Sequence, residues 1–395
     1  MGNGGWRGPW RRAVLAGLFA ALPSCDSGSG ARASLSVAET LGSADTAGYA
    51  RAVEPPDLVF PRDHGPHPAF RHEWWYFTGN LSTVGPTGSR REFGFQLTIF
   101  RNALRPDSAA GVASEWSTRQ AFMGHFALTE ITDGGFHAFE RFDRGAVGLA
   151  GARADPVRVW IGDWSIALDG SDPAAGEYPT FTIRADEGGV GLALDLVAEK
   201  PVVLQGDRGL SPKGPEPGTA SHYYSFTRLR AGGTVTTPGG TRAVQGFAWL
   251  DREWSTSALS PGVVGWDWFA LQLDDESELM VYRLREEDGG TAPFSAGTFV
   301  GPEGRVTKLG ADDFALEASG RWTSPRGGAY PSGWRIRVPS LSLDLEVQPR
   351  LPDQELDLAF RYWEGAVEVR GRSDGATVAG RGYVELTGYA EAPVP

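Results

Sequence analysis

A two-residue alternation of apolar and polar side chains constrains this 395-residue chain more than any other feature. In EFGFQLTIF (92–100) and LSLDLEV (341–347), every second residue is large and apolar. Such alternation is typical of β-strands that bury one face. Clusters such as DGG (133–135), TPGG (237–240) and EDGG (287–290) separate these runs and predict hairpin turns. Because no long pattern of helical period follows residue 25, we expect an all-β protein made of antiparallel sandwiches or barrels.

The N-terminal residues predict export to the cell envelope. Three arginines precede an apolar stretch (13–22) that fits the core of a signal peptide and is too short to cross a bilayer as a mature helix. The next residues, LPSC (22–25), resemble a bacterial lipobox, which would make Cys25 the lipidated residue; a simple secretory signal is the alternative. We therefore expect a signal peptide (1–24) and a flexible tether (25–56) on a periplasm-facing lipoprotein, with inner and outer membrane both open.

Net charge, the single cysteine and an internal repeat limit the partners, the stabilising bonds and the domain organisation that we expect. The net charge of −12 argues against nucleic acid as a partner. A single cysteine permits no disulfide within the chain, so the exported fold depends on its core. A faint internal repeat pairs FGFQLT (93–98) with FALQLD (269–274), which favours two similar domains. We place these domains at residues 57–245 and 246–395.

The run RHEWWYF combines a base, an acid and four aromatic residues. A strand here places His72, Trp74 and Tyr76 on one face, and Glu73 and Trp75 on the other. Neither face is polar enough for open solvent, so we expect both to be covered. A buried carboxylate is costly unless it is paired or protonated. Glu73 is thus either a structural partner of an arginine or an unpaired acid with a raised pKa, suited to donate a proton.

A second aromatic cluster carries three further acids. FAWLDREWS (247–255) and GWDWFALQL (265–273) put Trp249, Asp251 and Glu253 on one strand face, and Trp266 and Trp268 on the face opposite Asp267. Aromatic faces stabilise cations, and a carboxyl group in an apolar pocket stays protonated near neutral pH. The alternative is a domain interface filled by tryptophans, with the acids bonded to arginines or backbone.

Other motifs carry less weight. GRSDG (371–375) matches the nucleophile elbow of serine hydrolases, but the following residues predict a hairpin where that motif needs a helix. His64, His67, His72 and Glu73 have no familiar metal-ligand spacing. We therefore expect neither a serine nor a metallo-hydrolase, and no metal or cofactor.

Several stretches together resemble the AttH/CrtC-like lipocalin family, whose members include carotenoid 1,2-hydratases. They are HEWWYFTGNL (72–81), LSPKGPEPGTASHYYSFTRL (210–229), VQGFAWLDREWS (244–255), GWDWFALQLDD (265–275), YWEGAVEV (362–369) and GYVELTGY (382–389). The resemblance implies two lipocalin-like β-barrel domains packed together around an apolar ligand cavity.

Three hypotheses for the function follow. The leading one is a membrane-tethered protein that binds a lipophilic small molecule or lipid, in the service of an ABC exporter of the AttEFGH or MacB type. Its ligand would contact Trp74, Trp75, Tyr76, Trp249, Trp254, Trp266 and Trp268. The second hypothesis, an enzyme, is described in the next paragraph. The third hypothesis is a structural protein of the cell envelope, with filled barrels and an exposed apolar patch.

The second hypothesis is an enzyme that hydrates, cyclises or isomerises an isoprenoid or polyene by acid catalysis. Its proton donor would be Glu73, Asp251, Glu253 or Asp267. Water or substrate would be positioned by His72, His222 or Tyr224. This hypothesis requires at least one of these acids to line a cavity without an arginine partner.

Overall fold

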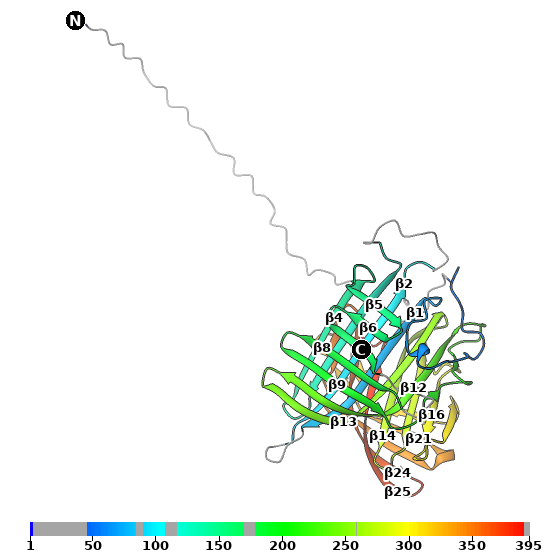
Figure 1. Ribbon diagram of the computed structural model, residues 1–395. Helices are drawn as coiled ribbons and strands as arrows, with labels where there is room; N and C mark the ends of the chain where they lie inside the picture. The colour runs from blue at the N-terminus through cyan, green and yellow to red at the C-terminus, as the bar shows by residue number, and fades with distance from the viewer. Residues whose placement is uncertain (3–45, 84–89, 107–116, 170–177, 258, 391–395) are drawn as a thin grey trace, which may run out of the picture. The chain divides into compact units, whose positions relative to one another are not determined.

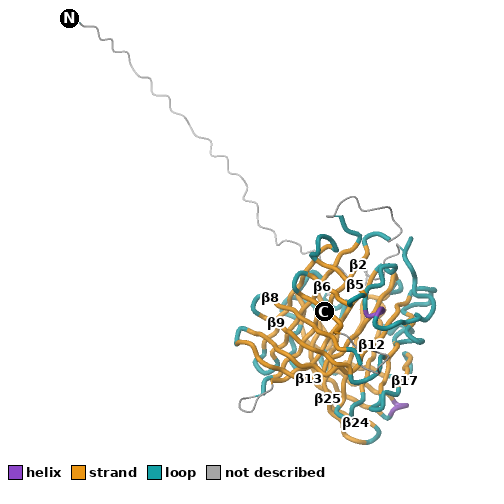
Figure 2. The backbone as a smooth tube through the Cα atoms, in the orientation of Figure 1, coloured by secondary structure: helices purple, strands orange, loops and turns teal. Residues whose placement is uncertain are grey.

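A computed structural model describes residues 1–2, 46–83, 90–106, 117–169, 178–257 and 259–390. The predicted signal peptide from residue 3 onward, Cys25 and most of the predicted tether lie outside these residues. Nearly all regular structure in the described part is β-strand (Figures 1 and 2), beside two 3-10 helices, η1 (Arg62–His64) and η3 (Pro339–Leu341). None of the described helices has the length and hydropathy needed to cross a membrane. The expectation of an all-β antiparallel fold is confirmed.

The first sheet is a nearly closed barrel. Eleven strands follow one path, β4-β3-β2-β1-β13-β12-β9-β8-β7-β6-β5, and β5 returns close to β3 and β4; β10 and β11 pair with β12. The strands are β1 (His72–Thr83), β2 (Glu92–Ala103), β3 (Gln120–Glu130), β4 (Gly135–Arg144), β5 (Ala150–Ala154), β6 (Val157–Ile161), β7 (Trp164–Asp169), β8 (Thr180–Glu187), β9 (Val190–Ala198), β10 (Val203–Leu204), β11 (Leu210–Pro212), β12 (Ala220–Thr237) and β13 (Gly240–Ser257).

The second sheet has ten strands and is also antiparallel. Its path is β17-β16-β15-β14-β25-β24-β22-β21-β18, with β23 paired to β24; β19 and β20 form a separate hairpin. The strands are β14 (Val263–Leu273), β15 (Glu278–Glu286), β16 (Ala296–Val300), β17 (Val306–Gly310), β18 (Ala315–Ala318), β19 (Arg321–Thr323), β20 (Ala329–Pro331), β21 (Trp334–Val338), β22 (Leu343–Pro349), β23 (Glu355–Asp357), β24 (Arg361–Ser373) and β25 (Ala376–Leu386).

The alternation of side chains explains why each sheet has a core of its own and a second face for the other sheet. On β1, Trp75 and Phe77 point into the barrel, where aromatic and aliphatic side chains pack the interior. Trp74 and Tyr76 point outward and join an apolar cluster with Trp268 and other residues of the second sheet. Both faces of β1 are therefore covered, as the sequence predicted.

Close packing and buried ion pairs join the two sheets, which belong to one compact unit. A Cβ atom added to Gly94 on β2 would lie 2.6 Å from the Cβ of Ala366 on β24, so the sheets nearly touch there. Glu278 on β15 is fully buried and pairs with Arg228 of β12 and with Lys200, which lies between β9 and β10. The predicted domain division at residue 245 stays a prediction. Strand β13 spans this position and pairs with β1 up to Ser255 and with β12 up to Ser257.

Candidate functional site

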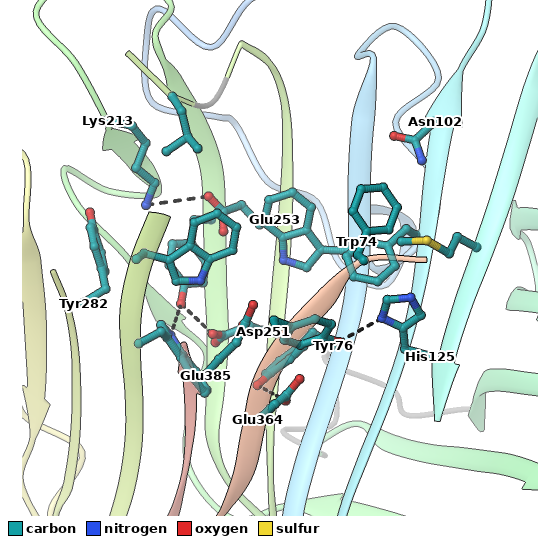
Figure 3. A pocket seen from close by; sticks show the side chains of 18 of the residues that line it. Trp74, Tyr76, Asn102, His125, Lys213, Asp251, Glu253, Tyr282, Glu364 and Glu385 are labelled. Atoms are coloured by element: carbon teal, nitrogen blue, oxygen red, sulfur yellow. Dashed lines mark hydrogen bonds and ion pairs between the residues drawn. The ribbon is translucent and has the colours of Figure 1, made fainter. Parts of the chain in front are cut away.

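A cavity of about 250 Å³ lies between the outer face of the barrel and the second sheet (Figure 3). Its walls are mainly aromatic and come from Trp74, Tyr76, Phe100, Phe122, Phe142, Tyr223, Trp266, Trp268, Tyr282, Phe360 and Tyr362. Its polar groups include Asn102, His125, Lys213, Asp251, Glu253, Glu364 and Glu385. An apolar pocket with a few converging polar groups is the usual form of a small-molecule site.

Strand register brings the acids to this cavity. On β13, Asp251 and Glu253 share one face because they are two residues apart. They pair across the ladder with Tyr76 and Trp74 of β1, so acids and rings alternate on the barrel wall. On the opposite wall, Glu364 of β24 is the direct cross-strand partner of Glu385 of β25.

Asp251 is buried among neutral hydrogen-bond donors. Its Oδ1 accepts bonds from the Ser225 hydroxyl (2.5 Å) and the Trp249 indole N–H (2.7 Å), and its Oδ2 lies 2.5 Å from the Tyr223 hydroxyl. Burial raises the pKa of Asp251 to about 7, although these hydrogen bonds act in the opposite direction. A protonated Asp251 can donate to the Tyr223 or Ser225 hydroxyl, so the same geometry accommodates both protonation states.

Glu253 has a cation beside it. The Lys213 Nζ lies 3.7 Å from Glu253 Oε1, 3.0 Å from the Ser211 hydroxyl and 4.0 Å from the centre of the Tyr282 ring (Figure 3). Burial by itself lowers the pKa of a lysine, but the neighbouring Tyr282 and Glu253 raise the pKa of Lys213 above its ordinary value. Lys213 and Glu253 thus form an ion pair at this part of the cavity.

Glu364 and Glu385 form a pair of facing acids. The Tyr76 hydroxyl donates to Glu364 Oε1 over 2.5 Å (Figure 3). The buried Oε2 atom makes no hydrogen bond of standard geometry among the described residues, although the Tyr362 hydroxyl lies near enough to lower the pKa of Glu364. Burial and the charge of Glu385 raise the pKa of Glu364 well above its usual range. Burial also raises the pKa of Glu385 to about 8, with a further contribution from the charges of Asp251 and Glu253. The two residues therefore hold protons that exposed glutamates would release at neutral pH.

His125 supplies a further polar group on the cavity wall. Its Nδ1 lies 2.8 Å from the Tyr362 hydroxyl, and its Nε2 lies 3.3 Å from Glu140 Oε2. The Nε2 atom makes no hydrogen bond among the described residues. The imidazole therefore orients the Tyr362 hydroxyl next to the acids.

Glu73 lies away from the cavity and takes the arginine-paired alternative. It is fully buried between Arg101 and Arg252, and the backbone N–H of His67 also donates to it. Burial alone raises the pKa of a carboxyl group, but these two arginines hold the pKa of Glu73 well below its usual range. The geometry thus makes Glu73 a structural anion at one end of the barrel, with no proton to donate near neutral pH.

Asp267 is paired in the same way. It accepts bonds from Arg283, Arg285 and the Tyr389 hydroxyl on the face of β14 that lies opposite Trp266 and Trp268. Asp267 does not line the cavity, and because it is paired with two arginines it does not meet the requirement for an acid without an arginine partner.

The other predicted polar residues also lie outside the cavity lining. His72 contacts Asn102 over 2.7 Å, and burial lowers its pKa to about 4. His222 donates to the backbone carbonyl of Glu54, and Tyr224 lies inside the barrel with its hydroxyl 2.7 Å from His64. None of His72, His222 and Tyr224 is among the described residues that line the cavity.

The predicted aromatic residues divide between two environments. Trp74, Tyr76, Trp266 and Trp268 line the cavity. Trp249 does not line the cavity, but its indole N–H donates to Asp251, which does. Trp75 and Trp254 instead cover the guanidinium of Arg252, which lies 3.8 and 5.2 Å from their ring centres.

Glu364 and Glu385 were missed as candidate acids, although both lie in stretches that carried the family resemblance. A signal was present. In Tyr-x-Glu (362–364, 383–385), as in Trp-x-Asp (249–251), an aromatic residue precedes an acid by two positions on one strand face. The serine of GRSDG is the last residue of β24 and pairs with Ala376 of β25, so this stretch forms the predicted hairpin. The described residues contain no cluster of three or more His, Cys, Asp or Glu side chains able to hold a metal.

Comparisons with known proteins agree with this architecture. Crystal structures of a protein described as an AttH from Nitrosomonas europaea (34% identity, TM-score 0.74, 86% of this chain and 99% of that one) and of kievitone hydratase from Nectria haematococca (15%, 0.65, 87% and 96%) share the fold. Kievitone hydratase from Fusarium solani subsp. phaseoli is 22% identical over 209 residues, a match that spans 51% of this chain and 58% of the hydratase. The profile of the AttH-like family matches residues 51–389, and the chain therefore belongs to the AttH-like family.

Proposed function

We propose that the cavity between the two sheets binds a lipophilic small molecule. The observation that carries this proposal is a pocket of about 250 Å³ with aromatic walls, set between two sheets whose own cores are filled by other side chains. Burial of apolar ligand surface supplies roughly 25 cal/mol per Å², so such a pocket favours an apolar occupant. The acids at one side would orient its polar end.

Binding of the neutral fluorophore N-phenyl-1-naphthylamine tests the proposal. We expect saturable binding at one site, weakened at least tenfold by Met123→Trp, which adds bulk at the cavity wall. Val306→Trp is the matched control, because Val306 is exposed on β17 and outside the cavity lining. Equal binding by both variants, or none by the unaltered chain, would contradict a binding role and favour a structural one.

A lipid anchor and an ABC exporter complete this proposal. The anchor rests on the lipobox-like residues 22–25, and the exporter rests on the family resemblance. Cys25 would carry the anchor and hold the protein at the cell envelope on the periplasmic side. Incorporation of labelled palmitate into the chain, and its loss in Cys25→Ser, tests the anchor. Co-purification of an ABC permease from detergent-solubilised envelopes tests the partner.

A second candidate function is acid-catalysed addition of water to an alkene held in the same cavity. The specific observation is Glu364, a buried acid with a raised pKa. Among the described residues, its Oε2 makes no hydrogen bond of standard geometry, and no arginine or lysine is bonded to it. Its proton would pass to one alkene carbon, the neighbouring rings would stabilise the cation, and water would bond to the other carbon and return a proton to a carboxylate. The kievitone hydratases are named for a hydration reaction, which motivates this candidate.

The variant Glu364→Gln separates catalysis from binding. If the candidate is correct, incorporation of ¹⁸O from water into a prenyl alcohol such as geraniol falls at least 100-fold in this variant. Binding of N-phenyl-1-naphthylamine persists, because the side chain keeps its shape. If the unaltered chain incorporates no ¹⁸O, the hydration candidate is wrong and only the binding function stays proposed.

A further inference from the structure

We infer that the preferred ligand of the inter-sheet cavity is an organic cation, an ammonium group on an apolar chain. This inference rests on the proposed binding function and names the class of ligand. Four carboxyl groups line the cavity, whereas its described lining residues include one lysine and no arginine. The cavity therefore holds more acids than cations to pair with them.

The arginines nearest to these acids in the strands point away from the cavity. Arg252 lies between Asp251 and Glu253 in the sequence, so its side chain points to the other face of β13, where it pairs with Glu73. Arg283 likewise pairs with Asp267 behind Trp266 and Trp268. The strands thus direct these guanidinium groups away from the cavity and leave it acidic.

Glu364 and Glu385 mark the place for the positive charge. As direct cross-strand partners, their Cβ atoms lie roughly 5 Å apart, a spacing at which two carboxylates repel each other. Glu364 is 1% exposed, and its Oε2 makes no hydrogen bond of standard geometry among the described residues. A buried, unpartnered oxygen of this kind is costly unless a proton or a cation satisfies it. Lys213 does not provide this cation, because it is paired with Glu253.

The aromatic walls suit the same ligand. Tyr76 and Trp268 meet edge to face with ring centres 5.2 Å apart, and Tyr76 also bonds to Glu364. Rings beside carboxylates attract quaternary ammonium groups through the negative faces of their π-systems. An apolar chain attached to such a group would extend along the remaining rings of the cavity.

Binding of a cation should release protons. Without ligand, burial holds protons on Glu364 and Glu385, and a bound ammonium would favour the ionised form. The other titratable groups on the cavity wall are Asp251, Glu253, His125 and Lys213, with the hydroxyls of Tyr76, Tyr223, Tyr282 and Tyr362. Because Glu385 has a pKa of about 8, the affinity for a cation should rise up to tenfold per pH unit from pH 6 to 8.

Calorimetric titration of the full chain with three octyl compounds tests the inference. At pH 8 we expect octyltrimethylammonium to bind at least tenfold more tightly than 1-octanol, and octyl sulfate not to bind. Titration in two buffers of different ionisation enthalpy should show close to one proton released per cation at pH 7. Glu364→Gln and Glu385→Gln should each reduce the preference for the cation over octanol at least fivefold. The control Glu346→Gln makes the same substitution at an exposed position of β22 and should leave the preference unchanged.

The outcomes separate the two proposals. If octanol binds as tightly as the cation, or if octanol binds and the cation does not, the inference of a cationic ligand is wrong. The proposed binding function then stays in place. If none of the three compounds binds, both proposals fail. The comparison of head groups uses the unaltered chain, so it does not depend on the folding of any variant.

Discussion

Replacement of Glu73 by glutamine tests whether this buried acid is a structural partner of two arginines. The side chains of Glu73, Arg101 and Arg252 are all fully buried. Glutamine keeps the shape but removes the negative charge, and its amide group would direct N–H donors at a guanidinium. Removing one partner of a buried ion pair costs ~3–5 kcal/mol, because the opposite charge stays buried without compensation.

The surroundings of the two arginines place the expected loss within this range. Arg101 keeps bonds to the carbonyls of His67 and Phe70, and Arg252 keeps a bond to the carbonyl of Gly65, so part of the charge remains solvated by the backbone. Arg101 Nη1 already lacks a partner among the described residues, so nothing further is available to it. We therefore expect Glu73→Gln to lose ~3–5 kcal/mol in the free energy of unfolding.

Urea unfolding followed by tryptophan fluorescence measures this loss, and a thermal melt should show a fall in Tm of roughly 4–7 °C. Glu317→Gln is the control, because its pairing with Arg337 lies on the surface and such pairs contribute about 0–1 kcal/mol. A loss below about 1 kcal/mol for Glu73→Gln, with an unchanged denaturant slope, would refute the structural role. Glu73 would then again be a candidate for a functional acid.

Three further predictions concern the cavity and the packing of the sheets. The pKa of Asp251 is raised to about 7, so the native state keeps a proton that the unfolded chain releases near pH 4. The contribution of this group to stability is therefore complete below pH 4 and is lost as the pH rises to 7. In Asp251→Asn, the urea midpoint should change less with pH between pH 4 and 7 than in the unaltered chain. Unchanged pH dependence would show that Asp251 is ionised throughout. Gly94→Val should cost ~1–3 kcal/mol by pressing on Ala366, and a wild-type midpoint would show that the sheets can separate there without cost. Tyr76→Phe leaves Glu364 without its hydrogen bond and should destabilise by ~1–3 kcal/mol in the same assay; a neutral result would mean that this bond contributes little.

Much of the fold could be predicted from the sequence alone. The alternation of apolar and polar residues has a period of two, and local sterics translate that period directly into strands with two distinct faces. It correctly predicted an all-β antiparallel protein, two covered faces on the strand that begins at His72, and a hairpin at GRSDG. The motifs on these strands also carried the resemblance to the family to which the chain belongs.

The roles of the acids were decided by tertiary structure. Alternation determines the face on which a side chain lies, but not the residue that meets it across the sheet. Glu73 and Arg252 are 179 positions apart and meet because β1 pairs with β13. Glu364 lies opposite another acid because β24 pairs with β25 in one register, and a shift of one residue would have turned its side chain to the other face. A carboxyl group buried beside an arginine is an anion, and the same group buried beside another acid keeps its proton, so the partner across the sheet determines its chemistry.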